Sequence, residues 1–110
     1  MNTLSSHVLD TTLGKPAQGI ALTLTTPSGE TLKGETDGDG RFNQWAANNE
    51  NGFPAGIYTL RFHCKSYLER QHGKSFYPHI DIAFELENND GHYHVPLLIS
   101  PFGFSSYRGS

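Results

Sequence analysis

Apolar and polar residues alternate along several short stretches of the chain. Successive side chains of an extended strand point to opposite faces, so this alternation predicts strands with one buried face each. Strands are expected over residues 3–10, 20–26, 30–36, 56–64 and 78–86, with a short one beginning at Arg41. The residues expected on the inward faces include Leu4, Val8, Ile20, Leu22, Leu24, Tyr58, Leu60, Phe62, Ile80, Ile82, Phe84 and Leu86.

The last twenty residues, GHYHVPLLISPFGFSSYRGS, contain the densest apolar run of the chain. Their first half predicts a strand with His92 and His94 on one face and, on the other, the apolar side chains of Tyr93, Val95, Leu97 and Ile99. The Ser-Pro pair at 100–101 ends this strand, and a second is expected to run back from residue 102. Chain ends are usually permissive of change, so this concentration of histidine, arginine and tyrosine singles out the C-terminus.

Clusters of glycine, proline and asparagine separate the predicted strands. Turns are expected at residues 12–16, 27–29, 37–40 and 88–91, and Asp90-Gly91 is a hairpin signal. Residues 45–54, from Trp45 to Pro54, are polar and rich in asparagine, which predicts a surface loop.

One short helix is expected after residue 64. Ser66-x-x-Glu69 matches a capping box, and Gly73 is suited to the position that ends a helix, leaving about two turns between them. Seven or eight short strands with one short helix predict an all-β sandwich.

Length and composition agree with that fold class. The 110 residues correspond to one domain, 1–110, and a hydrophobic fraction of 35% with 12 glycines and 6 prolines favours a turn-rich antiparallel sandwich. A net charge of −3 argues against nucleic acid or an anionic membrane surface as a partner.

The sequence also gives an expectation for location. No apolar run is long enough to span a bilayer, and residues 1–10 have neither the basic nor the apolar region of a signal peptide. Cys64 is the single cysteine, so no intrachain disulfide can form, and a reducing compartment is the default. We therefore expect a cytoplasmic protein.

Two motifs raise the question of a metal. His92 and His94 share a strand face with a spacing that suits zinc, but a third ligand would have to come from elsewhere; partly exposed strand histidines are an equally good interpretation. A calcium loop counted from Glu35 places acidic residues at positions one, three and five, yet Ala46 stands where a bidentate glutamate is required. A turn is the favoured interpretation of Asp37 to Gly40, and no metal is expected.

Other single residues are less specific. Cys64 is on the inward face of its strand, as expected of a buried thiol that packs as a small apolar side chain. Arg41 follows a turn and Arg108 lies next to the chain end, positions from which a guanidinium can bind a planar anion through two hydrogen bonds. Taken alone, each arginine is better explained as a solvated surface residue.

Together these motifs resemble transthyretin-like proteins of the 5-hydroxyisourate hydrolase type, over essentially the whole chain. The resemblance is carried by SHVLD (6–10), GKPA (14–17), TD (36–37), GRF (40–42), GIY (56–58), FYP (76–78), HYHVPLL (92–98), SP (100–101) and YRGS (107–110). The C-terminal tetrapeptide is the most specific of these, because it marks the enzyme branch of the family and is lacking in the hormone-carrier branch.

The resemblance implies a sandwich of two four-stranded sheets with one short helix. It also implies a homotetramer, built as a dimer of dimers, with active sites at the dimer–dimer interface. The histidine faces of the first and seventh strands point away from the sandwich core, so a second dimer could close them into a cleft.

The implied reaction is hydrolysis of the six-membered ring of 5-hydroxyisourate in urate degradation, without metal or other cofactor. The product is 2-oxo-4-hydroxy-4-carboxy-5-ureidoimidazoline. Water attack on such a carbonyl requires a base, donors for the developing oxyanion and groups that hold the ring. His7 and His94 are the candidates for water activation and proton transfer, with Arg41 as the third catalytic residue; either histidine could be the primary base.

Substrate binding is assigned to Arg41 and to the tail residues Tyr107, Arg108, Gly109 and Ser110. The two guanidinium groups would hold the urate-like ring by forked hydrogen bonds. The hydroxyl and terminal carboxylate of Ser110 would help to shape the site. His92 is given at most a supporting role.

Two functions of other classes remain open. The first is a transthyretin-like carrier that binds a small aromatic ligand in the same interface without catalysis, although the tail and both histidines argue against it. The second is a metal-binding or purely structural sandwich module.

Overall fold

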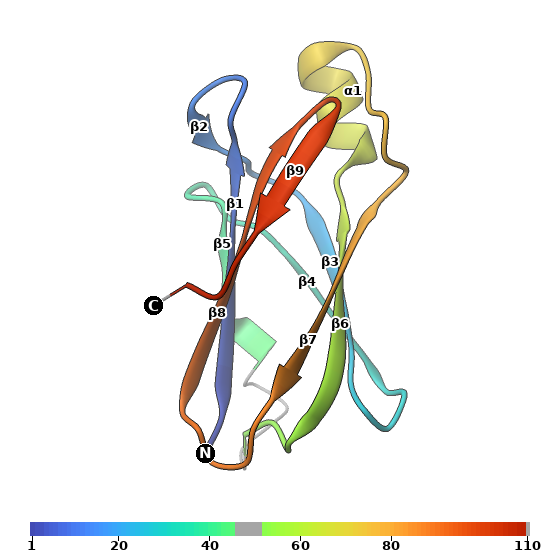
Figure 1. Ribbon diagram of the computed structural model, residues 1–110. Coiled ribbons are helices and arrows are strands. Elements are labelled where there is room, and N and C mark those ends of the chain that lie inside the picture. The colour runs from blue at the N-terminus through green and yellow to red at the C-terminus, as the bar shows by residue number, and fades with distance from the viewer. Residues whose placement is uncertain (46–51, 110) are drawn as a thin grey trace.

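Two β-sheets pack face to face in the computed structural model of the chain, which describes residues 1–45 and 52–109 (Figure 1). In chain order the elements are β1 (Thr3–Asp10), β2 (Lys15–Pro16), β3 (Ala21–Thr25), β4 (Thr31–Glu35), β5 (Arg41–Phe42), β6 (Gly56–His63), α1 (Lys65–His72), β7 (Ile80–Leu86), β8 (His92–Ser100) and β9 (Gly103–Ser106). The predicted all-β sandwich with one short helix is confirmed.

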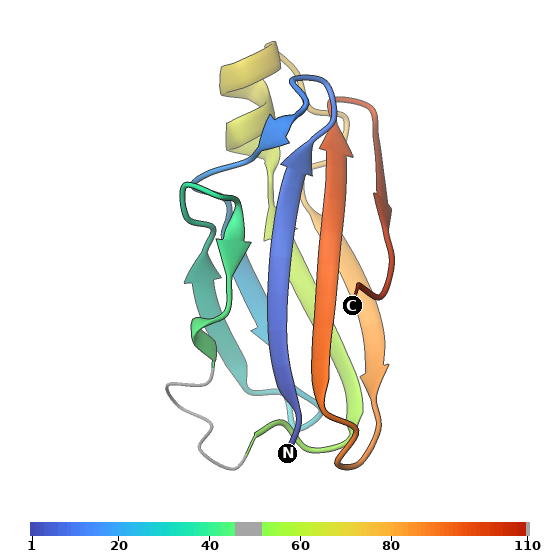
Figure 2. The ribbon, with the colours of Figure 1, turned by 90° about the vertical axis from the view of Figure 1, so that its left-hand side faces the viewer.

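The two sheets differ at one edge. One sheet has the order β4-β3-β6-β7, and the other has β2-β1-β8-β9 with β5 also paired to β1. The short strands β2 and β5 lie one after the other along the same edge of β1 (Figure 2). The fourth strand position of this sheet is therefore divided between two segments, one of which, β2, lies in the expected turn at residues 12–16.

The longest strand pairing joins the two ends of the chain. β1 and β8 run parallel, with Ser5 opposite His94 and His7 opposite Pro96. The hairpin suggested by Asp90-Gly91 is wrong, because β7 and β8 belong to different sheets and this turn crosses between them. Since alternation predicts a face but not a partner, the sequence did not identify this pairing.

The predicted inward faces form the core. Val8, Leu24, Tyr58, Leu60 and Leu97 are fully buried between the sheets. The other fully or almost fully buried apolar side chains on predicted inward faces are Leu4, Ile20, Leu22, Phe62, Cys64, Ile80, Leu86, Tyr93, Val95 and Ile99. Burial of these faces is the main favourable contribution to folding, and it fixes which side of each strand faces outward.

The predicted surface loop from Trp45 to Pro54 is wrong at both of its aromatic residues. Trp45 and Phe53 are only 2% and 4% exposed. Trp45 contacts Phe42 edge to face at 4.6 Å between ring centroids, and Phe53 contacts Tyr58 in the same way at 5.8 Å. Neither residue is part of an alternating apolar pattern in the sequence, and residues 46–51 lie outside the described part of the chain.

Helix α1 ends as expected but begins differently. Gly73 is in the left-handed conformation at φ 78°, and its N–H donates to the carbonyl oxygen of Glu69. The predicted capping box is wrong, because Cys64 occupies the cap position without a side-chain hydrogen bond and Ser66 lies within the first turn. No helix in the described residues is long and apolar enough to cross a membrane.

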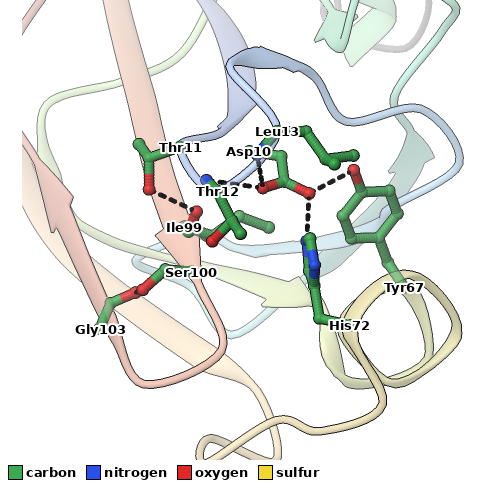
Figure 3. A network of polar contacts seen from close by, with 9 residues as sticks. All are labelled: Asp10, Thr11, Thr12, Leu13, Tyr67, His72, Ile99, Ser100 and Gly103. Carbon is green, nitrogen blue, oxygen red and sulfur yellow. Dashed lines mark hydrogen bonds and ion pairs between the residues drawn. The ribbon is translucent and has the colours of Figure 1, made fainter.

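A buried carboxylate connects α1 to the end of β1 (Figure 3). One oxygen of Asp10 accepts hydrogen bonds from the backbone N–H groups of Thr12 and Leu13, and the other accepts from Tyr67 Oη and His72 Nε2, each at 2.8 Å. Burial opposes ionisation of Asp10, but the bonds from His72, Tyr67 and Leu13 lower its pKa on balance. Burial and the bond to Asp10 raise the pKa of Tyr67 to about 12, so its hydroxyl remains a donor.

Candidate functional site

Three strands bring a group of polar side chains onto the outward face of one sheet. His7 on β1 lies opposite Arg41 on β5, and Ser5 on β1 lies opposite His94 on β8. The rings of His7 and His94 have centroids 6.4 Å apart. The structure thus brings together the three residues predicted to be catalytic, although they come from distant parts of the sequence.

Hydroxyl groups of β1 connect the two histidines of β8. The Oγ of Ser5 lies 2.7 Å from His94 Nδ1 and 2.9 Å from His92 Nε2. The other ring nitrogen of His92, Nδ1, lies 2.6 Å from Thr3 Oγ1. Thr3, His92, Ser5 and His94 therefore form one continuous chain of hydrogen bonds along the sheet face.

The surroundings of His94 favour its neutral form. Partial burial lowers the pKa of this imidazole, and the nearby positive charge of Arg41 and the His7 and His92 rings lower it further. A neutral imidazole can accept a proton near neutral pH, which is what a general base for water requires.

The turn before β5 positions Arg41. The carboxylate of Asp37 accepts hydrogen bonds from the backbone N–H groups of Asp39 at 2.9 Å and Arg41 at 3.0 Å. These two bonds, that of Arg41 first, lower the pKa of Asp37 and keep it ionised. The tight turn predicted at residues 37–40 is confirmed, with the N–H of Gly40 donating to the carbonyl oxygen of Asp37.

A hollow of ≈ 250 Å³ lies beside this turn. It is lined by Ser5, Ser6, Asp37, Arg41, Phe42, Asn43 and His92. Within residues 1–45 and 52–109, no group of three or more histidine, cysteine or acidic side chains is arranged to hold a metal ion. The donors here are an imidazole, hydroxyls and a guanidinium, which suit a polar organic ligand.

The predicted tail residues divide between two places. The N–H of Gly109 donates to the carbonyl oxygen of His94 at 2.7 Å, so the tail runs beside the histidine face. The guanidinium of Arg108 instead lies 4.3 Å from the ring centroid of Tyr93 and 3.5 Å from a carboxylate oxygen of Asp90. Tyr93 alternates with His94 along β8, so Arg108 is directed toward the opposite side of the sheet.

Tyr107 and Arg108 line a second cavity, of ≈ 390 Å³, at the open edge between β7 and β8. Ile82 and Phe84 also line it, which explains why these two predicted core residues are only half-buried. Tyr107 itself is 61% exposed. Ser110, the remaining predicted tail residue, lies outside the described part of the chain.

Sequence reasoning did not single out Ser5, Thr3 or Asp37 as parts of this site. Alternation along β1 already placed Ser5 and Thr3 on the same face as His7, which was the available signal. Only the parallel register of β1 and β8 brings their hydroxyls within reach of His92 and His94.

Comparisons with known proteins show what the whole chain is similar to. The model of the HIUase/Transthyretin family matches residues 4–109. A protein of Schizosaccharomyces pombe named "Probable 5-hydroxyisourate hydrolase" is 37% identical over 114 residues, covering 97% of this chain and 90% of that protein.

Two solved structures have the same fold. The Klebsiella pneumoniae 5-hydroxyisourate hydrolase superposes with a TM-score of 0.86 and 37% identity, over 100% of this chain and 94% of that chain. Sea bream transthyretin in complex with thyroxine superposes with a TM-score of 0.83 and 28% identity, over 97% and 94%.

Proposed function

Because the chain belongs to the HIUase/transthyretin family, we propose that it is a 5-hydroxyisourate hydrolase. The main support for the proposal is that His7, Arg41 and His94 lie next to one another on the same outward sheet face. Gly109 lies beside them. The similar proteins named 5-hydroxyisourate hydrolase give the substrate. The reaction opens the six-membered ring of that substrate by water attack on a carbonyl.

The site supplies both a base and a positive charge for this step. His94, kept neutral by its surroundings, and the adjacent His7 activate the water and move protons. The guanidinium of Arg41, an exposed group next to both rings, binds the ring oxygens and stabilises the oxyanion that develops at the carbonyl. Since imidazole and guanidinium provide proton transfer and charge stabilisation, the proposal requires no metal or other cofactor.

The tail completes the site in this proposal. Tyr107, Arg108, Gly109 and Ser110 bind substrate together with Arg41. Arg108 is 59% exposed, so its rotation toward the substrate must break only a surface ion pair with Asp90 and the stacking on Tyr93, each worth about 1 kcal/mol or less.

The proposed assembly is a homotetramer, a dimer of dimers with its sites at the dimer–dimer interface. In a single subunit the histidine face is an open sheet surface, on which Arg41 and His92 are exposed. A second dimer packed against this face would exclude water and strengthen the electrostatic interactions inside the cleft. We also propose that residues 1–110 form one domain and that the protein is cytoplasmic.

The direct test is the absorbance decay of freshly generated 5-hydroxyisourate with and without the protein. We expect a rate well above the spontaneous one, unchanged by a chelator. A rate equal to the spontaneous one would contradict the proposal and favour the carrier function, for which similarity to a thyroxine-binding transthyretin is the supporting observation. Calorimetric titration with thyroxine then tests whether the protein binds this ligand, as a carrier would.

A further inference from the structure

We propose that Ser5 couples His94 to His92 as a proton relay between the reacting water and bulk solvent. The relay rests on the proposed function, because it moves the protons that ring hydrolysis releases and requires. It assigns positioning and transfer roles to Ser5 and His92.

The geometry of the relay comes from the pairing of β1 with β8. Thr3 is opposite His92 and Ser5 is opposite His94, so hydroxyls and imidazoles alternate across the two strands. Three contacts of 2.6, 2.9 and 2.7 Å join Thr3, His92, Ser5 and His94 in sequence. All three distances are those of good hydrogen bonds.

The hydrogen bonds that join these four side chains can all point in one of two directions. Each neutral imidazole has one N–H donor and one bare acceptor nitrogen, and each hydroxyl can donate once while accepting. In the first direction His94 Nδ1–H donates to Ser5, Ser5 donates to His92 Nε2, and His92 Nδ1–H donates to Thr3. In the second, every one of these bonds is reversed. The bare nitrogen of His94 is Nε2 in the first direction and Nδ1 in the second.

Water attack converts the first direction into the second. His94 Nε2 takes a proton from the attacking water, whose oxygen forms the new bond to the carbonyl carbon. The Nδ1 proton of His94 passes to Ser5 Oγ, and the hydroxyl proton of Ser5 passes to His92 Nε2. His92 passes its Nδ1 proton to Thr3 Oγ1, Thr3 releases its own hydroxyl proton to solvent, and His92 returns to the neutral form.

Breaking of the carbon–nitrogen bond reverses the relay. His94 Nε2–H donates its proton to the leaving nitrogen, and Nδ1 takes the proton of Ser5. Ser5 takes the Nε2 proton of His92, His92 Nδ1 regains a proton from the hydroxyl of Thr3, and Thr3 takes one from solvent. One water is consumed, and each group ends the cycle in its starting state.

The surroundings direct protons outward after the first step. His94 is half-buried beside Arg41 and His7, and burial first, then these charges, lowers its pKa. His92 is exposed in the subunit, and the relay places this end of the hydrogen-bond chain at the mouth of the proposed cleft, where protons exchange with bulk water. A positive charge on His94 is therefore disfavoured, and the relay moves the proton toward the exposed end of the hydrogen-bond chain.

A similar contact on the other sheet provides a matched control. Thr23 Oγ1 lies 2.8 Å from His63 Nε2, but this hydroxyl–imidazole pair lies outside the candidate site. Thr23→Val therefore removes the same kind of hydrogen bond from a similarly exposed surface and should leave turnover unchanged.

The relay is tested first on kinetics. Ser5→Ala is expected to lower kcat by about tenfold or more, within the range of general acid–base contributions, with KM nearly unchanged. Ser5→Thr, which keeps the hydroxyl, should retain most of the turnover. His92→Gln should lower kcat in a buffer too dilute to carry the protons in place of His92. Added imidazole should restore kcat. Wild-type kcat in both Ser5→Ala and His92→Gln would overturn the relay.

The second readout does not depend on activity. In ¹⁵N NMR spectra of the free protein, Ser5→Ala should change the tautomer balance of His94 and uncouple its titration from that of His92, and Thr23→Val should do neither. Unchanged histidine spectra would contradict the relay even if the protein is an active hydrolase. If the wild-type protein gives no rate above background, the proposed function fails, whereas the NMR result still decides whether the two rings are coupled.

Discussion

The backbone N–H of Gly109 donates a hydrogen bond to the carbonyl oxygen of His94, at a distance of 2.7 Å. The two residues form an isolated antiparallel bridge beyond the last full strand. A Cβ atom added at Gly109 would lie 2.5 Å from Cδ2 of the His94 ring. The end of the chain is thus in direct contact with a proposed catalytic side chain, and this position requires glycine for lack of space.

Gly109→Ala should therefore displace the His94 ring, the tail or both. Because misplacement of a reacting group by about 1 Å can cost about a hundredfold in rate, we expect a loss of tenfold or more in kcat. The contact is near the surface, so the melting temperature should change little. The matched control is Gly103→Ala in the same sheet, where an added Cβ meets only Ser100 Oγ at 3.6 Å. Equal activity in both variants would show that the close contact has no functional effect.

Replacing either proposed catalytic histidine should reduce turnover strongly. We expect His7→Ala and His94→Ala each to lower kcat by roughly a hundredfold or more, the usual size of a general acid–base contribution. Both rings lie on the outward face, so neither change leaves a cavity in the core. Turnover is measured alongside native mass. His79→Ala is the control, because this histidine directly precedes β7 of the other sheet. Near wild-type rates in correctly assembled His7→Ala and His94→Ala would remove both from the mechanism.

The buried Asp10 network should make stability depend on pH. The pKa of Asp10 is lowered in the folded state, so the carboxylate contributes stability above its unfolded pKa of about 3.9 and loses it as the pH falls through the folded value. Asp10→Asn should reduce the free energy of unfolding by about 2 kcal/mol at neutral pH, because bonds to a buried charge are lost. It should also make the melting temperature less sensitive to acid below about pH 4.

The exposed Arg61–Asp81 pair is the control for this prediction. Its two side chains are 43% and 38% exposed and join through two hydrogen bonds, so water screens them and Asp81→Asn should have a much smaller effect. Thermal melting from pH 3 to pH 8 measures both variants. Equal losses in the two would contradict a special role for the Asp10 network.

Assembly should limit activity if the sites lie between dimers. Dilution through the dissociation range should lower the specific activity while circular dichroism shows that the subunits remain folded. Mass photometry at each concentration gives the oligomer present. An isolated monomer with full specific activity would be incompatible with interface sites.

Alternation along the strands was enough to predict the sandwich and the outward faces of His7 and His94, because a strand with one buried face has few ways to place its side chains. Which strands lie side by side could not be predicted in the same way. Ser5 and His94 are 89 residues apart and meet through a parallel pairing that no turn signal specifies. For that reason the hydrogen bonds between Ser5 and the two histidines could not be predicted from the sequence.

Two other differences come from contacts that the sequence pattern does not specify. Trp45 is buried against the ring of Phe42, although no periodic pattern around it in the sequence indicates burial. The tail motif predicts that Arg108 binds the substrate. In the structure its guanidinium stacks on Tyr93, an interaction between distant residues that a terminal motif does not encode.

The tail itself gives the sharpest distinction between an enzyme and a carrier or structural module. β9 ends at Ser106, and residues 107–109 continue past it with two side-chain contacts of Arg108 and one backbone bridge of Gly109. If they were an ordinary chain end, their removal would cost little. If they form part of the site, they hold the substrate and the His94 ring.

We therefore predict that deleting Tyr107 to Ser110 abolishes most of the hydrolysis of 5-hydroxyisourate, with the fold and the native mass largely unchanged. The core residues of β8 and β9 are untouched, so the melting temperature should fall by only a few degrees. A C-terminal affinity tag should also impair turnover, since added residues would crowd the tail next to His94, whereas a tag before Met1 should be milder. Arg108→Ala should lower turnover by itself, and Arg70→Ala, which removes a similar arginine stacked on Tyr67 of α1, should not. A correctly assembled deletion variant with full activity would exclude the tail from the site and would also weaken the proposed function.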